Sequence, residues 1–377
     1  MVRSRAVETW RYVDCGAVDA FENNAQMAVL SRSASDAGVG IFQTSVWGRT
    51  HLNVGWFDDV DATLDLAACE RLGIQVIRRP FAGGGTAFYD AGCAVMWGLM
   101  VPKPEAGGVD LDGEIARMQP IVLDALARVG LGEVTFQGSA DLRWVNDRKL
   151  GGISAGDFGR VLSVGGFLNV APPNLDLYLQ VVRVPDDKFK DKLVKDMREY
   201  VCTAQDVRCT ALTYEEWRDA LLGAVTAAGI ELARQPLTEV EAAALTKISN
   251  RIAGDDSVRR ISSDRFRAEH AEHAVGLANH KGRKLCRAGV ALDASGVVAA
   301  AMMAGDMHVA PPDTLDRVAE ALVGARADDD SELRARIAAV WEADGVHQAD
   351  ATMGVTTDDL LTAVTKAVAA AAASPEG

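Results

Sequence analysis

The sequence has few basic residues for its length: 39 lysines and arginines stand against 53 aspartates and glutamates, a formal net charge of −14. Such a surface repels phosphate backbones and anionic lipid headgroups, so we expect neither nucleic acid nor a membrane as a partner. No stretch approaches the roughly 20 apolar residues of a membrane span. The N-terminal residues also lack the continuous apolar core of a signal peptide. The expected location is therefore the cytoplasm.

Cysteine is scarce as well. The six cysteines form no CxxC pair, and none has a histidine at zinc-finger spacing. They are Cys15, Cys69, Cys93, Cys202, Cys209 and Cys286. We expect reduced thiols. With 49% hydrophobic and 24% charged residues among 377, the chain has the composition of a globular protein long enough for two domains.

The hydrophobic pattern lacks regular βαβ alternation and predicts an α+β fold, with helices packed on a mixed or antiparallel sheet. In the first part of the chain, helices are expected at 21–30 (capped by Asp19), 111–129, 186–200 and 214–228, and strands at 40–48, 74–79, 93–101 and within 133–170. A polar break at 253–263 suggests a larger domain over 1–255 and a small α+β domain over 256–377. In the second, we expect a helix at 264–278, strands at 284–292 and 297–304, and helices from Thr314, Ser331 and Thr357.

The Walker and Rossmann fingerprints are absent, since the glycine-rich stretch is followed by neither GK[ST] nor a helix start. That stretch is RRPFAGGGT, residues 78–86. Three adjacent glycines let a backbone approach a ligand closely and turn its N–H groups toward an anion. Arg78 and Arg79 can reach a carboxylate or phosphate with forked donors. A plain tight turn between two strands would explain the same residues.

A second stretch, DLRWVNDRKLGGIS at 141–154, places a lysine before two glycines in a pair of strands. A carboxylate is a poor electrophile, and ATP makes it reactive as an acyl-adenylate. The charge that develops on the acyl and α-phosphate oxygens favours a compact cation, which Lys149 supplies. Asp141 can hold Mg²⁺ against the phosphates. An exposed hairpin with a solvated lysine is the alternative.

Taken together and in this order, the two stretches resemble the motifs of the lipoate–protein ligase family. RRPFAGGGTAFYDAG resembles the family motif in which paired arginines precede a Gly-Gly-Gly turn, a His-Asp and a glycine. DLRWVNDRKLGGISA resembles its Asn-Asp segment, which is followed by Arg-Lys and small residues. Looser resemblance covers most of the chain, and residues 284–325 resemble the family's C-terminal accessory domain.

The resemblance implies a biotin/lipoyl-ligase-type catalytic domain that forms an acyl-adenylate, followed by a small accessory domain. Such enzymes join lipoate to ATP with release of pyrophosphate, and pass the acyl group to a lysine of a lipoyl carrier domain. It therefore implies ATP and Mg²⁺ as cofactors, a small carboxylic acid as substrate, Lys149 as the catalytic residue and Asp141 as the metal ligand. The implied substrate and adenylate contacts are Arg78, Arg79, Gly83, Gly84, Gly85, Thr86, Tyr89, Asp141, Gly152 and Ser154.

The sequence departs from the family pattern where Tyr89-Asp90 replaces His-Asp and Ala140-Asp141 replaces Asn-Asp. The aromatic residues of the region either edge a pocket suited to an aromatic acid or belong to the core; they are Phe81, Phe88, Tyr89 and Trp97. Three alternatives follow. The chain is an amide synthetase or acyl-CoA ligase for another acid, a non-catalytic relative that binds an acyl ligand, or an octanoyl transferase that uses a thioester and no ATP.

Overall fold

The computed structural model describes residues 8–80, 83–103, 111–138, 140–144, 147–157, 160–183, 195, 198–348 and 354–373. Phe81, Asn146 and most of the helix expected at 186–200 lie outside the described residues. Contacts divide the chain into two compact units. Unit 1 comprises Met1–His51, Phe88–Gln180 and Val184–Arg251, and unit 2 comprises Leu52–Ala87, Val181–Arg183 and Ile252–Gly377. The expected domain boundary at 255 stays a prediction, since unit 2 also takes in the segment that begins at Leu52.

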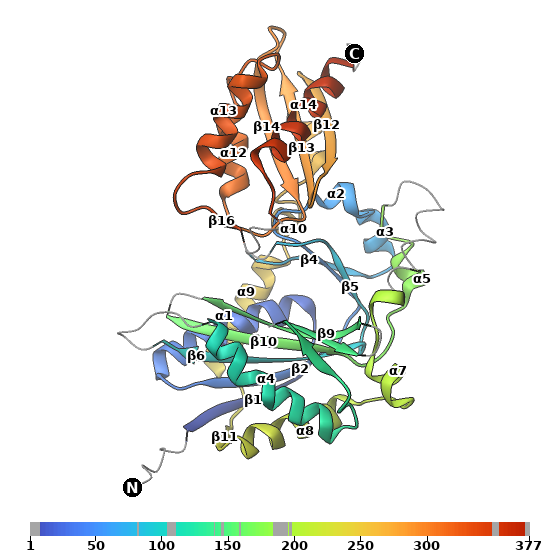
Figure 1. The fold of residues 1–377 in the computed structure, drawn as a ribbon, viewed down its shortest axis with the longest axis vertical. Helices are drawn as coiled ribbons and strands as arrows, with labels where there is room; N and C mark the ends of the chain where they lie inside the picture. Colours follow the sequence, from blue (N-terminus) through green and yellow to red (C-terminus); the bar gives the residue numbers. More distant parts are fainter. Residues whose placement is uncertain are drawn as a thin grey trace. The chain divides into compact units, whose positions relative to one another are not determined.

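Unit 1 is built on an eight-stranded sheet of order β11-β1-β2-β6-β10-β9-β8-β7 (Figure 1). Its strands are β1 Glu8–Val18, β2 Ile41–Trp47, β6 Ala94–Pro102, β7 Thr135–Gln137, β8 Asp141–Trp144, β9 Arg148–Asp157, β10 Val161–Asn169 and β11 Ile230–Arg234. β1 runs parallel to both β11 and β2, whereas the pairs from β2 to β7 are antiparallel. The sheet is therefore mixed, and its strands between 133 and 170 confirm the predicted meander.

Helices cover both faces of this sheet. The described helices of unit 1 are α1 Ala20–Ala37, α4 Leu111–Arg128, α5 Leu175–Tyr178, α7 Ala204–Arg208, α8 Tyr214–Ala227 and α9 Glu239–Ile252. Successive strand residues point to opposite faces. Phe42 and Leu99 belong to the core that α4 and α8 cover, while their neighbours Ile41 and Met100 pack with Leu30 of α1. The larger core thus lies on the face opposite α1.

The start of α1 follows its predicted cap. The Asp19 carboxylate accepts a hydrogen bond from the Glu22 N–H at 2.8 Å, and the Glu22 carboxylate accepts one from the Asp19 N–H at 2.9 Å. This reciprocal pair satisfies two N–H groups that the helix itself leaves unpaired. The strand β1 ahead of it was not predicted from the sequence.

Unit 2 contains shorter elements. The strands are β3 His51–Val54, β4 Gln75–Arg78, β5 Ala87–Tyr89, β12 Ala274–Lys281, β13 Leu285–Leu292, β14 Val298–Gly305, β15 Val309–Ala310 and β16 His347–Gln348; the first residue of β3 and the last two of β5 belong to unit 1. The helices are α2 Val60–Thr63, α3 Leu66–Arg71, α10 Asp255–Val258, α11 Ser263–Glu269, α12 Thr314–Leu322, α13 Asp330–Trp341 and α14 Thr357–Ala373. The sheets are ordered β4-β3-β5, β12-β13-β14 and β15-β16.

The three-stranded sheet β12-β13-β14 carries α12, α13 and α14 on one face. Alternate residues of β13, among them Cys286, Ala288 and Val290, are buried with these helices. A side chain at Gly276 would meet the Ala367 carbonyl oxygen at 2.0 Å, so only glycine lets β12 approach α14 this closely. The C-terminal strands and helices confirm the predicted small α+β module.

The helix predicted over 264–278 is wrong in its second half. α11 ends at Glu269, and β12 begins at Ala274 and pairs with β13 from Ala274↔Leu292 to Lys281↔Leu285. The hydrogen bonds and packing gained by pairing along the whole of β13 stabilise a strand here more than the short helical pattern stabilises a helix.

In the part of the chain that the structure describes, no helix is both long enough and apolar enough to cross a bilayer. All six cysteines are unpaired, as predicted.

Trp217 is 1% exposed in the larger core of unit 1, whereas Val240 is 80% exposed. We expect Trp217→Ala to lower the free energy of unfolding by about 3–5 kcal/mol, because the cavity adds to the lost burial. Val240→Ala should change it by no more than about 0.5 kcal/mol. Urea denaturation of both variants measures the difference, and equal effects would contradict the assignment of this core.

Candidate functional site

The best-defined ionic cluster on strands β8 and β9 surrounds Asp141. Its Oδ1 lies 2.7 Å from the Lys149 ammonium, and its Oδ2 lies 2.6 Å from the Arg143 guanidinium. Arg143 in turn donates to the Tyr200 hydroxyl at 3.0 Å and lies over the Tyr200 ring. The side chains of Lys149 and Asp141 are each 26% exposed, so the pair is held in place yet open to a ligand.

A β-bulge brings Lys149 to this position. Asp141 pairs with Gly152 and Leu142 with Gly151, but Arg143 pairs with Lys149, so Leu150 is an extra residue in β9. In a regular strand Lys149 would point to the face opposite Gly152 and Asp141. The bulge reverses that order, because Leu150 packs into the core on one face while Lys149 reaches Asp141 on the other.

Two opposing effects act on the pKa of the Asp141 carboxyl. Burial alone would raise its pKa, but the hydrogen bonds from Lys149 and Arg143 outweigh burial and lower the pKa below its usual value. Asp141 is therefore a carboxylate at neutral pH, and its charge holds the Lys149 ammonium in one place.

Glycine and serine lie beside Lys149 on its face of the sheet. A side chain at Gly152 would come within 3.3 Å of the Ala140 carbonyl oxygen, 3.5 Å of the Phe167 ring and 3.8 Å of the Lys149 Cε. Gly152 is itself buried, whereas Ser154, two residues further along β9, is exposed. The predicted contacts Gly152 and Ser154 thus lie on the same face of β9 as Lys149.

Tyr89 joins an aromatic cluster of unit 1. Its ring stacks on His51 with centroids 5.3 Å apart and lies 5.5 Å from Trp47 and 6.3 Å from Phe167. Phe167 pairs with Gly152 across β10 and β9, so the cluster borders the face of β9 that carries Lys149. Burial lowers the pKa of His51 to about 4, so its ring is neutral. Its Nδ1 donates to the Arg49 carbonyl at 3.1 Å.

Two other aromatic residues in or near the first motif, Phe88 and Trp97, have different neighbours. Phe88 packs on Tyr178 with centroids 5.3 Å apart, and Trp97 packs on Phe42 in the core beneath α4 and α8. The structure therefore assigns Trp97 to the core and leaves Tyr89 at the border of the site.

Arg78, predicted as an anion contact, is 1% exposed. Its Nη1 donates to the Gly55 and Asp58 carbonyls at 2.7 Å, and its Nη2 and Nε donate to the Val258 carbonyl at 2.8 and 3.1 Å. Further carbonyls, those of Trp56 and Ile261, lie at 3.2 Å. Burial lowers its pKa to about 10, and it remains charged. Arg78 thus fastens three chain segments of unit 2 together.

Arg79 shapes the glycine loop instead. Its Nη1 donates to the Asn53 carbonyl at 2.8 Å, and its Nη2 donates to three successive carbonyls, those of Gly83, Gly84 and Gly85, at 2.7, 3.2 and 2.8 Å. A side chain at Gly55 would meet the Gly84 carbonyl at 1.8 Å, so the loop lies directly on that backbone. The three predicted glycines therefore form one compact loop around one guanidinium.

Thr86 closes this loop. Its hydroxyl donates to the Asp58 carboxylate at 3.0 Å. Asp58 is 3% exposed, and burial raises its pKa. The glycine loop is therefore anchored by a buried group of unit 2.

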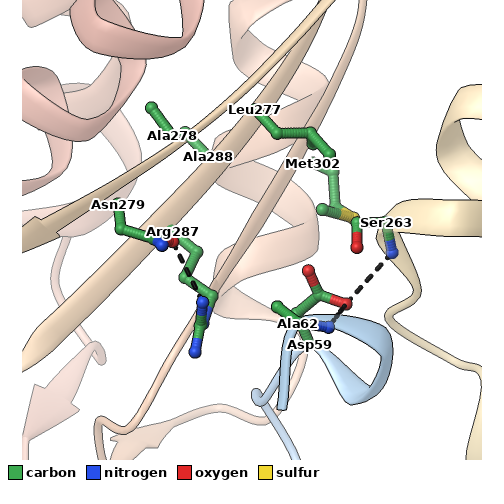
Figure 2. A pocket seen from close by; sticks show the side chains of 9 residues that line it. All are labelled: Asp59, Ala62, Ser263, Leu277, Ala278, Asn279, Arg287, Ala288 and Met302. Carbon is green, nitrogen blue, oxygen red and sulfur yellow. Dashed lines mark hydrogen bonds between the residues drawn. The ribbon is translucent and has the colours of Figure 1, made fainter. Parts of the chain in front are cut away.

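A separate pocket of about 100 Å³ lies within unit 2. Figure 2 shows its lining, in which Arg287 donates to Asn279 at 3.1 Å and the Ser263 N–H donates to Asp59 at 3.0 Å. Burial raises the pKa of Asp59. None of the catalytic or binding residues predicted from the sequence lines this pocket.

The predicted site residues are distributed over both units. Unit 1 holds Lys149, Asp141, Gly152, Ser154 and Tyr89, and unit 2 holds Arg78, Arg79, Gly83, Gly84, Gly85 and Thr86. Sequence reasoning missed two residues: Arg143, which contacts the second carboxylate oxygen of Asp141, and Tyr200, which contacts Arg143. Arg143 could have been found, because it alternates with Asp141 in one strand. Nothing in the sequence pointed to Tyr200.

No group of three or more histidine, cysteine, aspartate or glutamate side chains could hold a metal ion among the described residues. Both oxygens of Asp141 already face cations, at 2.6 and 2.7 Å. A divalent cation placed there would meet the charges of Lys149 and Arg143. The arrangement does not fit a resident Mg²⁺ on Asp141.

The family model described as lipoyl protein ligase A/B catalytic domain matches residues 23–226. Octanoyltransferase LipM of Carboxydothermus hydrogenoformans is 33% identical over 78 residues, which cover 20% of this chain and 29% of that protein. Lipoate-protein ligase A subunit 1 of Thermoplasma acidophilum is 26% identical over 198 residues, which cover 50% of this chain and 72% of that protein. The chain thus spans less than a third of the first of these relatives.

Two solved structures share the fold. A bipartite lipoate protein ligase of T. acidophilum, studied with its E2 lipoyl domain, superposes with a TM-score of 0.57 at 20% identity over 66% of this chain and 96% of that one. LipL1 of P. falciparum in complex with lipoate superposes with a TM-score of 0.65 at 12% identity over 94% of this chain and 99% of that one. The α+β fold predicted from the sequence is confirmed.

We expect Arg78→Met to lower the free energy of unfolding by at least about 3 kcal/mol, because several buried carbonyls lose their donor together. Arg317→Met, at an exposed position of α12, should lie within about 0.5 kcal/mol of wild type. Thermal and urea unfolding provide the measurement. If the Arg78 variant were as stable as the Arg317 variant, Arg78 would have no structural role and would instead be a ligand contact.

Proposed function

Because the chain belongs to the lipoyl protein ligase A/B catalytic-domain family, we propose that it activates a small carboxylic acid with ATP as an acyl-adenylate. Lipoate is the first acid to test, and the acceptor is a lysine of a lipoyl carrier domain. The family resemblance read from the sequence is confirmed. The acid, the nucleotide and the carrier are the proposal, and so is a cytoplasmic location.

The observation that carries the proposal is the placement of Lys149. Its ammonium lies 2.7 Å from the ionised Asp141, and both side chains are 26% exposed. A fixed and partly exposed point charge suits a reaction in which negative charge builds up on oxygen.

The proposed reaction has two steps. In the first, a carboxylate oxygen of the acid attacks the α-phosphorus of ATP, and pyrophosphate leaves with the electron pair of the broken P–O bond. In the second, the acceptor amine attacks the acyl carbon, loses a proton, and AMP leaves. Lys149 balances the charge on the acyl and α-phosphate oxygens in both steps. Asp141 and Arg143 act as positioning residues.

Mg²⁺ enters this scheme only as part of the Mg·ATP substrate. Magnesium often binds through one or two carboxylates together with substrate phosphates. Since Asp141 is already shared by two cations, no step is assigned to a metal held by it.

The border of the site favours an acid with an apolar tail. Tyr89 presents its ring to Phe167 edge-on, at 82° between the ring planes, and His51 behind it is uncharged. Such a wall suits a dithiolane, an alkyl chain or an aromatic ring. It supports both lipoate and the aromatic acid of a divergent amide synthetase or acyl-CoA ligase.

ATP-independent octanoyl transfer is the second candidate, because one of the similar proteins is an octanoyltransferase. A cysteine nucleophile reacts as its thiolate. Burial raises the pKa of both Cys93 and Cys202 to about 11, which leaves these thiols protonated at neutral pH. Neither of these two buried thiols is therefore a ready nucleophile.

The test is pyrophosphate release from Mg·ATP with lipoate, octanoate and several aromatic acids. We expect acid-dependent release that falls by about 100-fold or more in Lys149→Ala, the usual effect of removing one preorganised donor. Lys247→Ala, an exposed lysine of α9, is the matched control and should retain wild-type release.

Release with one non-lipoate acid alone would assign the protein to the divergent ligases. Octanoyl transfer from a carrier thioester without ATP would replace the proposal by the second candidate. Acyl-ligand binding without turnover of any substrate would leave only the non-catalytic alternative.

A further inference from the structure

The pocket of about 100 Å³ in unit 2 lies on one face of the β12-β13-β14 sheet (Figure 2). Leu277 pairs with Gly289, and Gly289 pairs with Met302, so the side chains of Leu277 and Met302 point to the same face. Arg287, two residues before Gly289 in β13, points to that face as well. The alternate residue Ala288 is buried with α12, α13 and α14 on the other face. The pocket therefore uses the face of the sheet opposite these three helices.

Asp59 places a buried carboxylate in this pocket, since its side chain is 3% exposed. Its Oδ1 accepts hydrogen bonds from the N–H groups of Asp61, Ala62 and Ser263 at 3.2, 3.4 and 3.0 Å. Figure 2 shows its other oxygen turned away from these donors, into the space that the strands border. Among the described residues, none forms an ion pair with Asp59. A buried carboxylate without a cationic partner is costly.

Arg287 places a cation in the same lining. Its side chain is 14% exposed. The Nη1 donates to the Asn279 side-chain oxygen at 3.1 Å, but the buried Nε has no hydrogen-bond partner among the described residues. The Asp58 Oδ1 lies 4.0 Å from Nε, which is too far for a hydrogen bond. A guanidinium has five N–H donors, so Arg287 retains unused donors beside the pocket.

The size of the pocket limits its ligand. One water-sized group takes roughly 10–15 Å³, so a volume of about 100 Å³ accepts about seven to ten non-hydrogen atoms. The remaining lining is largely apolar and includes Ala62, Leu277 and Met302. A small ligand that carries a positive and a negative charge close together, with a short apolar group, matches this lining.

We propose that the pocket binds a free α-amino acid with a short apolar side chain, its ammonium group on Asp59 and its carboxylate on Arg287. The two charge-assisted contacts supply partners to both side chains at once. A simple anion or a simple amine would leave one of the two unpaired. An ammonium beside Asp59 would also offset the burial that raises the pKa of its carboxyl. The site lies apart from Lys149 and goes beyond the proposed function.

The experiment follows the methyl signals of ¹³C-methionine in the full chain by NMR, without ATP or acid. Valine should shift the signal of Met302, which the variant Met302→Leu identifies by its loss, and the titration gives Kd. Isovalerate and isobutylamine have the same carbon skeleton as valine but keep only one of its charges. Each should bind at least about 10-fold more weakly than valine, because one charge-assisted contact is lost.

Two variants of the pocket act in different ways. Asp59→Asn keeps an acceptor for the three N–H groups and removes the charge, so valine should bind at least about 10-fold more weakly. Ala62→Leu keeps both charges and fills the pocket, so it should weaken binding as well. Asp330→Asn, at an exposed position of α13, is the matched control and should bind as wild type does. Thermal unfolding checks that each variant is folded.

Three results would overturn the proposal. Without any effect of valine on Met302, the pocket would hold water only. If isovalerate bound as tightly as valine, it would be an anion site that does not use Asp59. Valine affinity unchanged in both pocket variants would place the ligand elsewhere. Because the measurement needs neither ATP nor a carboxylic acid substrate, its result is independent of the proposed ligase activity.

Discussion

One extra residue in β9 places Lys149 beside Asp141. Leu150 has no partner of its own in the pairing of β8 with β9, so the strand changes face between Gly151 and Lys149. Without that bulge, Lys149 would point into the core beneath α4, and Leu150 would stand on the surface. With it, the apolar residue is buried and the ammonium meets Asp141. The position of the lysine is thus fixed by the burial of its neighbour.

Two adjacent arginines, Arg78 and Arg79, have different structural roles in unit 2. Strand residues alternate in direction, so Arg78 points into the interior and Arg79 toward the loop. Arg78 joins the backbone near Gly55 to that of Val258, far away in the sequence. Arg79 gathers the carbonyls of the glycine loop, while the Gly84 N–H donates to the Met307 carbonyl. The loop geometry therefore depends on the tertiary structure of unit 2, and not on its three glycines alone.

The sequence predicted the elements whose pattern is local. The cap at Asp19, the helix over 111–129 and the meander of 133–170 needed only periodicity and turn residues. The helix expected at 264–278 failed because its second half is the edge strand β12, stabilised by a partner that follows it in the chain. Arg78 and Arg79 were both predicted to contact the ligand, with Arg79 favoured, and the sequence alone does not reveal that Arg78 is buried.

Only some residues of the candidate site could be predicted from the sequence. Lys149 and Asp141 were paired from motif and chemistry, and the structure places them 2.7 Å apart. The bulge that makes this possible leaves no recognisable sign in RKLGG. Met307 and His308 could not be related to the glycine loop, because only the fold brings residues from the chain's last third to that loop.

The central claim is that the acid is activated through a bond to the α-phosphate. It is tested most directly with a carboxylic acid labelled with ¹⁸O in both carboxyl oxygens, turned over with ATP and an amine acceptor, followed by mass spectrometry of the nucleotide. The account predicts one ¹⁸O atom in the phosphate of the AMP formed. Label in inorganic phosphate, or acyl transfer that leaves ATP intact, would contradict it.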